Sequence, residues 1–339
     1  MRLVILMSFP KEWEQIKKAA FEVFKQRIES RAEVWCDIKG GAETGTTYRG
    51  CKEAFSKFLL NMNVIDAPVE PKTETVILNK HVSTPIMIAP MSSTITQIKP
   101  DAFVDLAKAA GDVESIAWIG YPNKRDTLQE VVSKKFSPII YIVKPLKDRG
   151  RIIEELRFAE ALGVHAVGVD VDSSAGLIPI GDEPHYMEMS APISTSELVK
   201  IRRSTGLPFI VKGVLCRRDA RAALRAGADA VVVSNHAGFA LDYSVPSVIA
   251  INDINKEIGG KLEVYLDSGV RRGSDILKAL ALGARAVLIG TVALWGLAIG
   301  GSEGVAHILR MLTSELKRTM MLTSVESVDK VPRTILRIT

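Results

Sequence analysis

Cysteine is scarce in this chain, with only Cys36, Cys51 and Cys216 among 339 residues. The three form no C-x-x-C pair, and their odd number leaves one thiol unpaired in any pairing scheme. A disulfide framework and a thiolate metal centre are therefore not expected, and we expect no other metal site. Unpaired thiols are typical of a reducing compartment, so we expect a cytoplasmic protein.

Long apolar runs and a strong charge imbalance are also lacking. No apolar run approaches the roughly 20 residues that cross a bilayer, and the run at residues 3–7 is too short for a secretory signal. We expect neither a membrane span nor export. The net charge of +5 comes from Lys and Arg residues scattered beside Asp and Glu, a pattern that does not indicate nucleic-acid binding.

The chain does contain a repeated alternation of strand-like and helix-like stretches. The strand-like runs are apolar and rich in β-branched residues, and the segments between them have apolar residues at helical spacing. Such alternation predicts parallel strands, and a single domain of this length fits the α/β class as a (β/α)8 TIM barrel. The eight predicted strands are residues 85–90, 115–120, 137–143, 165–170, 207–212, 229–234, 262–267 and 285–290.

An extension precedes the predicted barrel. We expect residues 1–80 to form a helical and hairpin extension packed on the barrel, and residues 81–339 to form the barrel with a C-terminal helix. Gly300 and Gly301 come just before that last helix. The elements predicted outside the eight units are helices around residues 11–30, 48–60 and 302–320 and a hairpin at 75–83 that caps the barrel floor.

The strand ends carry the residues of chemical interest. In such barrels the chemistry lies at the carboxyl ends of the strands, and the loops after strands seven and eight commonly bind a phosphate. The seventh predicted strand leads into D-S-G-V-R-R-G, residues 267–273, where backbone amides and Arg271 can meet an anion. Gly290 and Thr291 open the next helix, whose first amides also favour a phosphate. Two ordinary strand-to-helix turns with solvated arginines would show the same pattern.

The most specific stretches of the chain are IVKGVLCRRDARAALRAGADAVVVSNHAGFALD, LDSGVRRGSDILKALALGARAVLIGT and LAIGG. They resemble the FMN-dependent α-hydroxy-acid oxidase and dehydrogenase family, which includes glycolate-oxidase-like and lactate-oxidase-like enzymes. Weaker similarity extends to WCDIKGGAETGTTYRGCKEAF and TPIMIAPMSS. The resemblance covers nearly the whole chain and implies an oxidoreductase that carries FMN on its barrel.

The same resemblance implies roles for individual residues. Lys212 would lie against N1 and O2 of the flavin, where a cation stabilises the negative charge of the reduced ring. His236 would be the catalytic base, since imidazole exchanges protons near neutral pH. Asp172 would pair with this histidine, and Tyr141 would face the substrate. The residues expected at the cofactor are Pro90, Met91, Asp170, Lys212, Ser234, Asp267, Ser268, Gly269, Arg271, Gly290 and Thr291.

Departures from the family pattern concern mainly the substrate. Phe239 stands where the family has an arginine that holds a substrate carboxylate, and residues 173–193, where a second arginine is expected, contain neither Lys nor Arg. A tyrosine that contacts the carboxylate falls on Asp37, or on Trp35 if the match is shifted. Two positions that contact the flavin become Ile139 and Asp170. We therefore expect a substrate pocket, with Asp37 and Phe239, that disfavours carboxylates.

Several alternatives remain open at this point. A flavin-binding protein without turnover, a flavoenzyme like type 2 isopentenyl diphosphate isomerase and a flavin-free barrel are the other candidates. Hydrolase chemistry by Ser234 and His236 is not expected, because no G-x-S-x-G elbow occurs. The expected partner is a small-molecule substrate, with oxygen, a quinone or another protein as the electron acceptor, and the resemblance implies a homo-oligomer.

Overall fold

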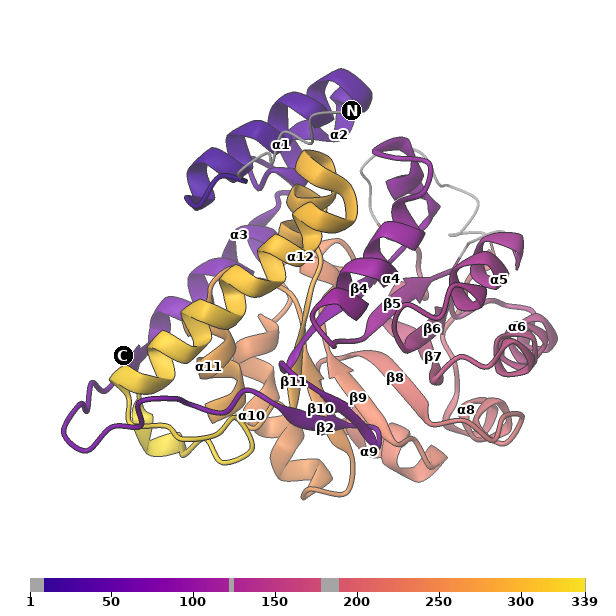
Figure 1. The fold of residues 1–339 in the computed structure, drawn as a ribbon. Helices are drawn as coiled ribbons and strands as arrows, with labels where there is room; N and C mark the ends of the chain where they lie inside the picture. The colour runs from indigo at the N-terminus through magenta and orange to yellow at the C-terminus, as the bar shows by residue number, and fades with distance from the viewer. Residues whose placement is uncertain (1–8, 122–124, 178–188, 339) are drawn as a thin grey trace.

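The computed structural model describes residues 9–121, 125–177 and 189–338. Eight parallel strands form a closed barrel in the order β10-β11-β4-β5-β6-β7-β8-β9, which confirms the predicted (β/α)8 fold (Figure 1). The barrel strands are β4 (Ile86–Met91), β5 (Ala117–Gly120), β6 (Ile139–Val143), β7 (Ala166–Asp170), β8 (Phe209–Val214), β9 (Ala230–Val233), β10 (Glu263–Leu266) and β11 (Ala286–Ile289).

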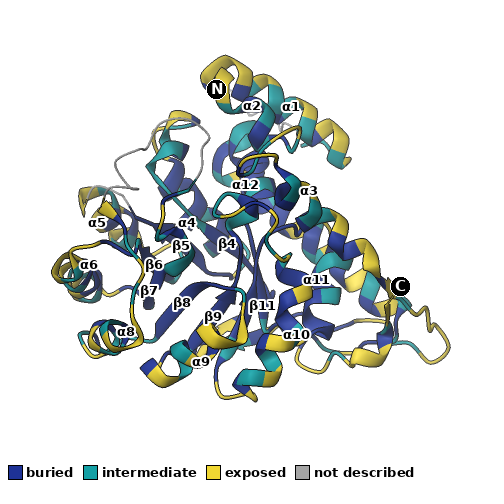
Figure 2. Ribbon diagram, turned by 180° about the vertical axis from the view of Figure 1, so that it is seen from behind, coloured by how far each residue is buried: buried dark blue, intermediate teal, exposed yellow. Residues whose placement is uncertain are grey.

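Alternate strand residues fill the barrel interior, and the others face the surrounding helices. Met87, Trp118, Ile210 and Tyr265 belong to the interior set and are fully buried. The rings of Trp118 and Tyr265 meet edge to face with their centroids 6.0 Å apart. Burying one large apolar side chain contributes about 1.5–3 kcal/mol. Figure 2 shows the strands buried throughout and the outer helices buried mainly on the side that faces the barrel, which is why the strand sequences are continuously apolar.

Helices alternate with the strands as the sequence predicts. Their ends have local causes: the side chain of Asp148 accepts a hydrogen bond from the amide of Arg151 at the start of α6, and Gly163 ends that helix with a φ of 83°. The helices of the barrel units are α4 (Ala102–Asp112), α5 (Arg125–Ser133), α6 (Arg149–Leu162), α8 (Thr195–Arg202), α9 (Arg217–Ala226), α10 (Ser247–Ile258), α11 (Gly273–Ala281) and α12 (Thr291–Leu322). Short 3₁₀ helices are η1 (Ala54–Lys57), η2 (Ser93–Gln97), η3 (Val171–Ser173), η4 (His236–Gly238) and η5 (Arg333–Ile335).

The long helix α12 is broken near its first third. Gly300 and Gly301 leave the helical conformation, and Gly301 has a φ of 57°, so the second part begins where the sequence predicts the last helix. Among the described residues, α12 alone is long and apolar enough to cross a membrane, but 67% of the apolar window is buried inside the protein. It packs against α1, α4 and α11 and is a core helix of the fold.

The described part of the amino-terminal extension, from residue 9, contains three α-helices, α1 (Trp13–Arg27), α2 (Glu29–Trp35) and α3 (Thr46–Glu53). The helix predicted around residues 11–30 is divided because Ile28 adopts φ −151° and ψ 68°. The helix predicted around 48–60 is wrong over its last residues, because β1 (Phe58–Leu60) pairs antiparallel with β12 (Leu336–Ile338). Pairing with the chain's last strand satisfies backbone groups that a helix would satisfy locally.

The predicted hairpin closes the floor of the barrel. Strands β2 (Thr75–Ile77) and β3 (Lys80–Val82) pair antiparallel. Ile77, Leu78 and Val82 are buried against the interior side chains of the barrel strands. Burial of these apolar residues fixes the hairpin at the amino ends of the strands, so the opposite, carboxyl ends remain for a functional site.

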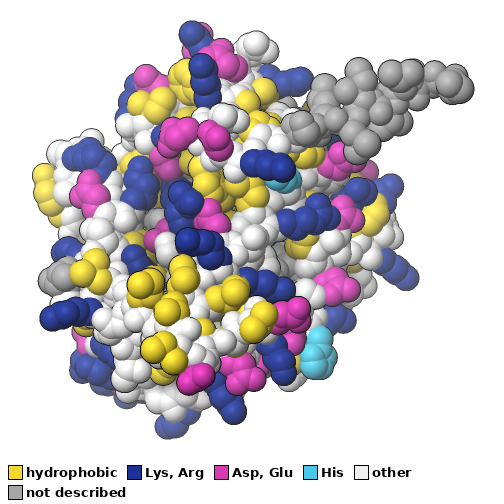
Figure 3. Space-filling view, turned by 60° about the vertical axis from the view of Figure 1, so that its left-hand side comes forward, with side chains coloured by type: hydrophobic (Ala, Val, Ile, Leu, Met, Phe, Trp, Pro, Cys, Tyr) yellow, Lys and Arg dark blue, Asp and Glu magenta, His cyan; other side chains and the backbone are white. Residues whose placement is uncertain are grey.

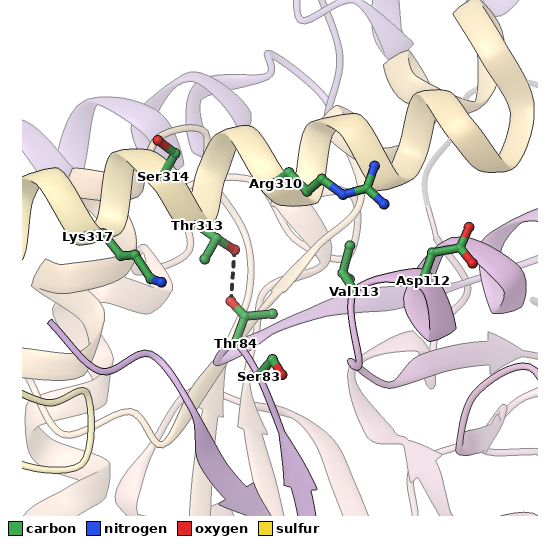
Figure 4. A pocket seen from close by; sticks show the side chains of 8 residues that line it. All are labelled: Ser83, Thr84, Asp112, Val113, Arg310, Thr313, Ser314 and Lys317. Carbon is green, nitrogen blue, oxygen red and sulfur yellow. Dashed lines mark hydrogen bonds between the residues drawn. The ribbon is translucent and has the colours of Figure 1, made fainter. Parts of the chain in front are cut away.

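A shallow pocket also lies at the amino ends of the strands (Figure 4). The hydroxyls of Thr84 and Thr313 lie 3.0 Å apart within it. Chemistry in this fold belongs to the other end of the barrel, so this pocket is not a candidate active site. It is lined by Ser83, Thr84, Asp112, Val113, Arg310, Thr313, Ser314 and Lys317.

Charged side chains of both signs cover the surface. Figure 3 shows Lys and Arg beside Asp and Glu over one face of the molecule. On the outer helices, Arg217 pairs with Asp253 at 2.8 Å and Arg221 with Glu257 at 2.7 Å. Such exposed pairs contribute little to stability, but the mixing of signs means that the positive net charge is not gathered into one patch on that face.

Candidate active site

Charged side chains converge at the carboxyl ends of β7, β8 and β9. The ammonium of Lys212 lies 3.2 Å from Asp170 Oδ1, 3.2 Å from Ser234 Oγ and 3.6 Å from Asp267 Oδ2. Its side chain is only 3% exposed. Burial alone would lower the pKa of Lys212, but the carboxylates of Asp170 and Asp267 outweigh it and raise the pKa. The structure thus brings four predicted site residues together around one buried cation.

Lys144, directly after β6, is a second cation at this site that the sequence analysis missed. Its ammonium is 2.7 Å from Asp170 Oδ2, and its side chain is 13% exposed. Burial alone would raise the pKa of Asp170, but Lys144 and Lys212 hold it well below its usual range. Ile140 and Ile142 face the barrel interior, and the alternation of strand residues directs position 144 to the same side. The apolar sequence of β6 does not mark that side by itself.

His236 lies beside this cluster with its Nδ1 3.0 Å from Asp172 Oδ1 and 3.4 Å from Lys212 Nζ. The backbone of His236 and Ala237 is left-handed, with φ values of 54° and 53°, a conformation that costs roughly 1–3 kcal/mol and clusters at functional sites. Gly213 makes room for Asp172, because a Cβ at that position would lie 2.6 Å from Asp172 Cγ. The predicted histidine–aspartate pair is therefore present, and a tight turn and a glycine position it.

The pKa values of the Asp170 and Asp172 carboxyl groups shift in opposite directions. Burial, followed by the charge of Asp170, raises the pKa of Asp172, and its Oδ2 is buried without a hydrogen-bond partner among the described residues. Ligand atoms of Asp170, Asp172 and His236 lie within 4.8 Å of one another. Because the ammonium groups of Lys144 and Lys212 already face Asp170, this group is an ion-paired cluster, and we assign no metal to it.

The loops after β10 and β11 form the predicted phosphate end. Gly269 has a φ of 101°, and a Cβ there would lie 2.3 Å from the carbonyl oxygen of Cys51, so only glycine fits. The hydroxyl of Ser268 accepts a hydrogen bond from the amide of Ala237 at 3.0 Å. Gly290 precedes the first turn of α12, and Arg271 reaches the hydroxyl of Thr291 at 3.2 Å. The predicted residues of this end lie together around a helix start.

Asp37 lies at this end and is engaged there. Its carboxylate accepts hydrogen bonds from Arg271 Nε at 2.6 Å and Arg271 Nη2 at 2.8 Å. The sequence analysis places Asp37 in the substrate pocket, and in the structure the guanidinium of Arg271 binds both of its carboxylate oxygens.

The structure places Tyr141 outside the site predicted for it. Its side chain belongs to the outer core between the barrel and the helices, and its hydroxyl lies 3.4 Å from Glu155 Oε2 on α6. Ile139 faces the same outer layer. The inward residues of β6 are Ile140 and Ile142, so Tyr141, one residue away, faces outward, because successive side chains of a strand point to opposite faces.

The remaining predicted residues line the same end of the barrel. Pro90 and Met91 end β4 and are half-buried. Phe239 follows η4, and its ring centroid lies 5.5 Å from that of Tyr48. Part of the segment that lacks Lys and Arg, residues 178–188, lies outside the described residues.

Residues 25–177 and 180–338 match the FMN-dependent dehydrogenase family. The chain belongs to this family. The peroxisomal (S)-2-hydroxyacid oxidase of Arabidopsis thaliana is 31% identical over 328 residues, 88% of this chain and 90% of that protein. 2-Hydroxyacid oxidase 2 of Homo sapiens is 31% identical, covering 88% of this chain and 92% of its own length. A crystal structure of mandelate oxidase matches with a TM-score of 0.86 at 27% identity, covering 98% of this chain and 99% of that one.

This FMN-dependent dehydrogenase family member is an oxidoreductase of the class that acts on CH–OH groups, and FMN is its cofactor. The residues present fit that cofactor. The buried ammonium of Lys212 suits a flavin ring that gains negative charge, and the glycine turn at Gly269 and the start of α12 suit a phosphate. Family membership favours the flavoenzyme interpretation over a flavin-free barrel, while the roles of single residues stay predictions.

Proposed function

We propose that this oxidoreductase oxidises the carbon that bears the hydroxyl group of an alcohol, or the amino group of an amine, with His236 as the base. The observation that carries this proposal is the contact of 3.0 Å between His236 Nδ1 and Asp172. With Nδ1 engaged, Nε2 is the ring nitrogen that can face a substrate.

The chain's own residues then have defined tasks. His236 takes one proton from the substrate, and Asp172 stabilises the imidazolium that results. Lys212 supplies a fixed positive charge in a site from which water is largely excluded. When bound, FMN would supply the redox chemistry, taking the two electrons and the second hydrogen that leave the substrate.

The charges at the site favour a neutral or cationic substrate. Lys144 and Lys212 both face Asp170, at 2.7 and 3.2 Å, and Phe239 occupies the position of the family's carboxylate-binding arginine. A substrate carboxylate would lose its hydration without meeting an unpaired cation in the described part of this cluster. An ammonium or hydroxyl group would instead meet a site rich in carboxylate oxygens. The same lack of an unpaired cation in the described part of the cluster also supports the alternative of a flavin-binding protein without turnover.

The base is tested by His236→Asn, because asparagine tolerates the left-handed backbone at this position but cannot accept the proton. We expect FMN to stay bound and anaerobic bleaching of the flavin by a turning-over substrate to slow by roughly 100-fold or more. His81→Asn is the control, since His81 is exposed on β3 at the floor of the barrel. Unchanged bleaching in His236→Asn would show that another group takes the proton.

The substrate class is tested by stopped-flow bleaching across a panel. Lactate and glycolate should reduce the flavin poorly, and bulkier uncharged alcohols or amines should do better. Fast turnover of lactate by the unmodified protein would contradict the proposed substrate charge while leaving the oxidoreductase activity in place. Failure of every substrate would favour the flavin-binding alternative.

We also propose a cytoplasmic location and assembly into homo-oligomers. Cys36 and Cys51 are buried free thiols and Cys216 is an exposed one, which supports a reducing compartment. The Arabidopsis relative is named as peroxisomal, so imaging of the tagged protein is the test of location. Light scattering of the purified protein tests assembly, and assays with oxygen and quinones test the electron acceptor.

A further inference from the structure

The guanidinium of Arg271 is almost fully occupied before any phosphate arrives. Besides its two bonds to Asp37, it donates to the carbonyl of Val270 at 2.8 Å and to the hydroxyl of Thr291 at 3.2 Å. A guanidinium has five N–H groups, so about one is left for another acceptor. The charge that should attract a phosphate at the start of α12 is already compensated by a carboxylate.

Asp37 is held firmly as an anion. The hydroxyl of Tyr48 lies 2.7 Å from Asp37 Oδ1, and the ammonium of Lys52 lies 3.8 Å from it. The side chain is 6% exposed. Burial alone would raise the pKa of Asp37, but the hydrogen bond and charge of Arg271 outweigh it and lower the pKa. Its backbone is left-handed, with a φ of 57°, so the turn after α2 is shaped to place this carboxylate against the arginine.

Two anions therefore compete for one guanidinium. The phosphate of FMN, with a charge near −2, must either share Arg271 with Asp37 or displace it, and like charges a few ångströms apart repel each other, more strongly in a partly buried site than in water. If the phosphate displaced Asp37 from Arg271, the ammonium of Lys52 would remain as a partner for the carboxylate. The carboxylate thus opposes the phosphate. Its other partners, Tyr48 and Lys52, belong to the amino-terminal extension.

We propose that Asp37 is a specificity-determining residue for the cofactor: by competing for Arg271, it lowers the affinity of the site for the phosphate end of FMN. The proposal rests on the FMN site described above. It implies that the chain holds FMN less tightly than Arg271 alone would allow, and that it discriminates less strongly between FMN and riboflavin, which lacks the phosphate.

The test is the dissociation constant of FMN and of riboflavin for the full chain freed of flavin, measured by fluorescence titration. Asp37→Asn keeps the size of the side chain, its acceptor for Tyr48 and a residue type that tolerates a left-handed backbone. We expect this variant to bind FMN about 10-fold more tightly, equivalent to about 1.4 kcal/mol, with riboflavin changed by less than about 2-fold. Unchanged or weaker FMN binding in Asp37→Asn would overturn the proposal.

Two further variants separate this effect from loosening of the extension. Asp242→Asn removes a carboxylate that binds Thr44 and Thr47 of the same extension but makes no contact with Arg271, so FMN affinity should not rise. Equal tightening in both variants would contradict competition at Arg271. Arg271→Gln should weaken FMN but not riboflavin, and an unchanged FMN affinity there would also refute the proposal.

A second replacement at Asp37 covers the case in which the asparagine variant fails to fold. Asp37→Gly suits the left-handed backbone and also removes the carboxylate, so it should tighten FMN in the same way. These experiments measure flavin binding and not activity. Their result therefore does not depend on whether the base and the substrate are assigned correctly, which the bleaching assays test.

Discussion

Replacing Lys144 by Met removes one of the two ammonium groups that face the buried carboxylate of Asp170. The contact is 2.7 Å long, and the exposed fractions of the two side chains are 13% and 4%, so solvent screens it only weakly. Removing one partner of a buried ion pair costs about 3–5 kcal/mol. Lys212 remains 3.2 Å from the other oxygen, so we expect about 3 kcal/mol, the lower end of that range.

The expected change in melting temperature follows from the length of the chain. An unfolding entropy of about 2.1 cal/mol/K per residue gives about 0.7 kcal/mol/K for a chain of this size, so 3 kcal/mol corresponds to a fall of about 4 °C. Differential scanning calorimetry of the FMN-loaded protein measures it. Lys147→Met is the matched control, since Lys147 is an exposed lysine of the same loop, and its melting temperature should change by less than about 1 °C.

The pH dependence identifies the cause of the loss. The pKa of Asp170 is lowered in the folded protein, so its contribution to stability is present above the unfolded value of about 3.9 and is lost as the pH falls through the folded value. Lys144→Met reduces that contribution. The difference in unfolding free energy between the variant and the parent should therefore be largest near pH 7 and shrink below about pH 4. A difference that persists unchanged at low pH would mean lost packing instead of lost charge, and no difference at pH 7 would refute the reasoning.

Three other replacements test separate parts of the structure. Tyr141→Phe should leave flavin bleaching within about 2-fold of the parent and cost less than about 1 kcal/mol, since only a long hydrogen bond to Glu155 is lost; a large kinetic effect would restore Tyr141 to the site. Gly269→Ala should lower stability by about 2–4 kcal/mol and release FMN on dialysis, because its Cβ would lie 2.3 Å from a backbone oxygen; a protein that keeps both its melting temperature and its flavin would contradict this. Gly213→Ala should slow bleaching while FMN remains bound, because its Cβ would displace Asp172, and normal bleaching would argue against a role for the His236–Asp172 pair.

The barrel could be predicted because its signals are local. Each strand is a short apolar run, and the predicted range 165–170 differs from β7 by one residue. Which side a residue faces is less local. All five residues of β6 are buried and none is charged, so no exposed side marks a face, and the prediction for Tyr141 chose the wrong face. Lys144 was missed for the same reason, since its direction depends on that alternation.

Contacts between distant segments could not be predicted from the sequence. Asp37 and Arg271 are 234 positions apart, and no periodicity or turn signal joins them. The sequence identifies each as a charged residue in a motif, but only folding shows that they neutralise each other. Motif matching therefore identified residues that the structure brings together at one end of the barrel, but it gave no sign that a carboxylate pairs with Arg271 there.

The small sheet of β1 and β12 has a consequence for how the chain is made. Residues 58–60 pair with residues 336–338, and the first barrel strand, β4, pairs on one side with the last, β11. On a ribosome that adds about 5–20 residues per second, these early segments wait for partners that are synthesised many seconds later. Until then β4 and β1 have open edges that can pair with other chains. Shielding of these two edges until residues 286–289 and 336–338 have been made would therefore limit pairing with other chains.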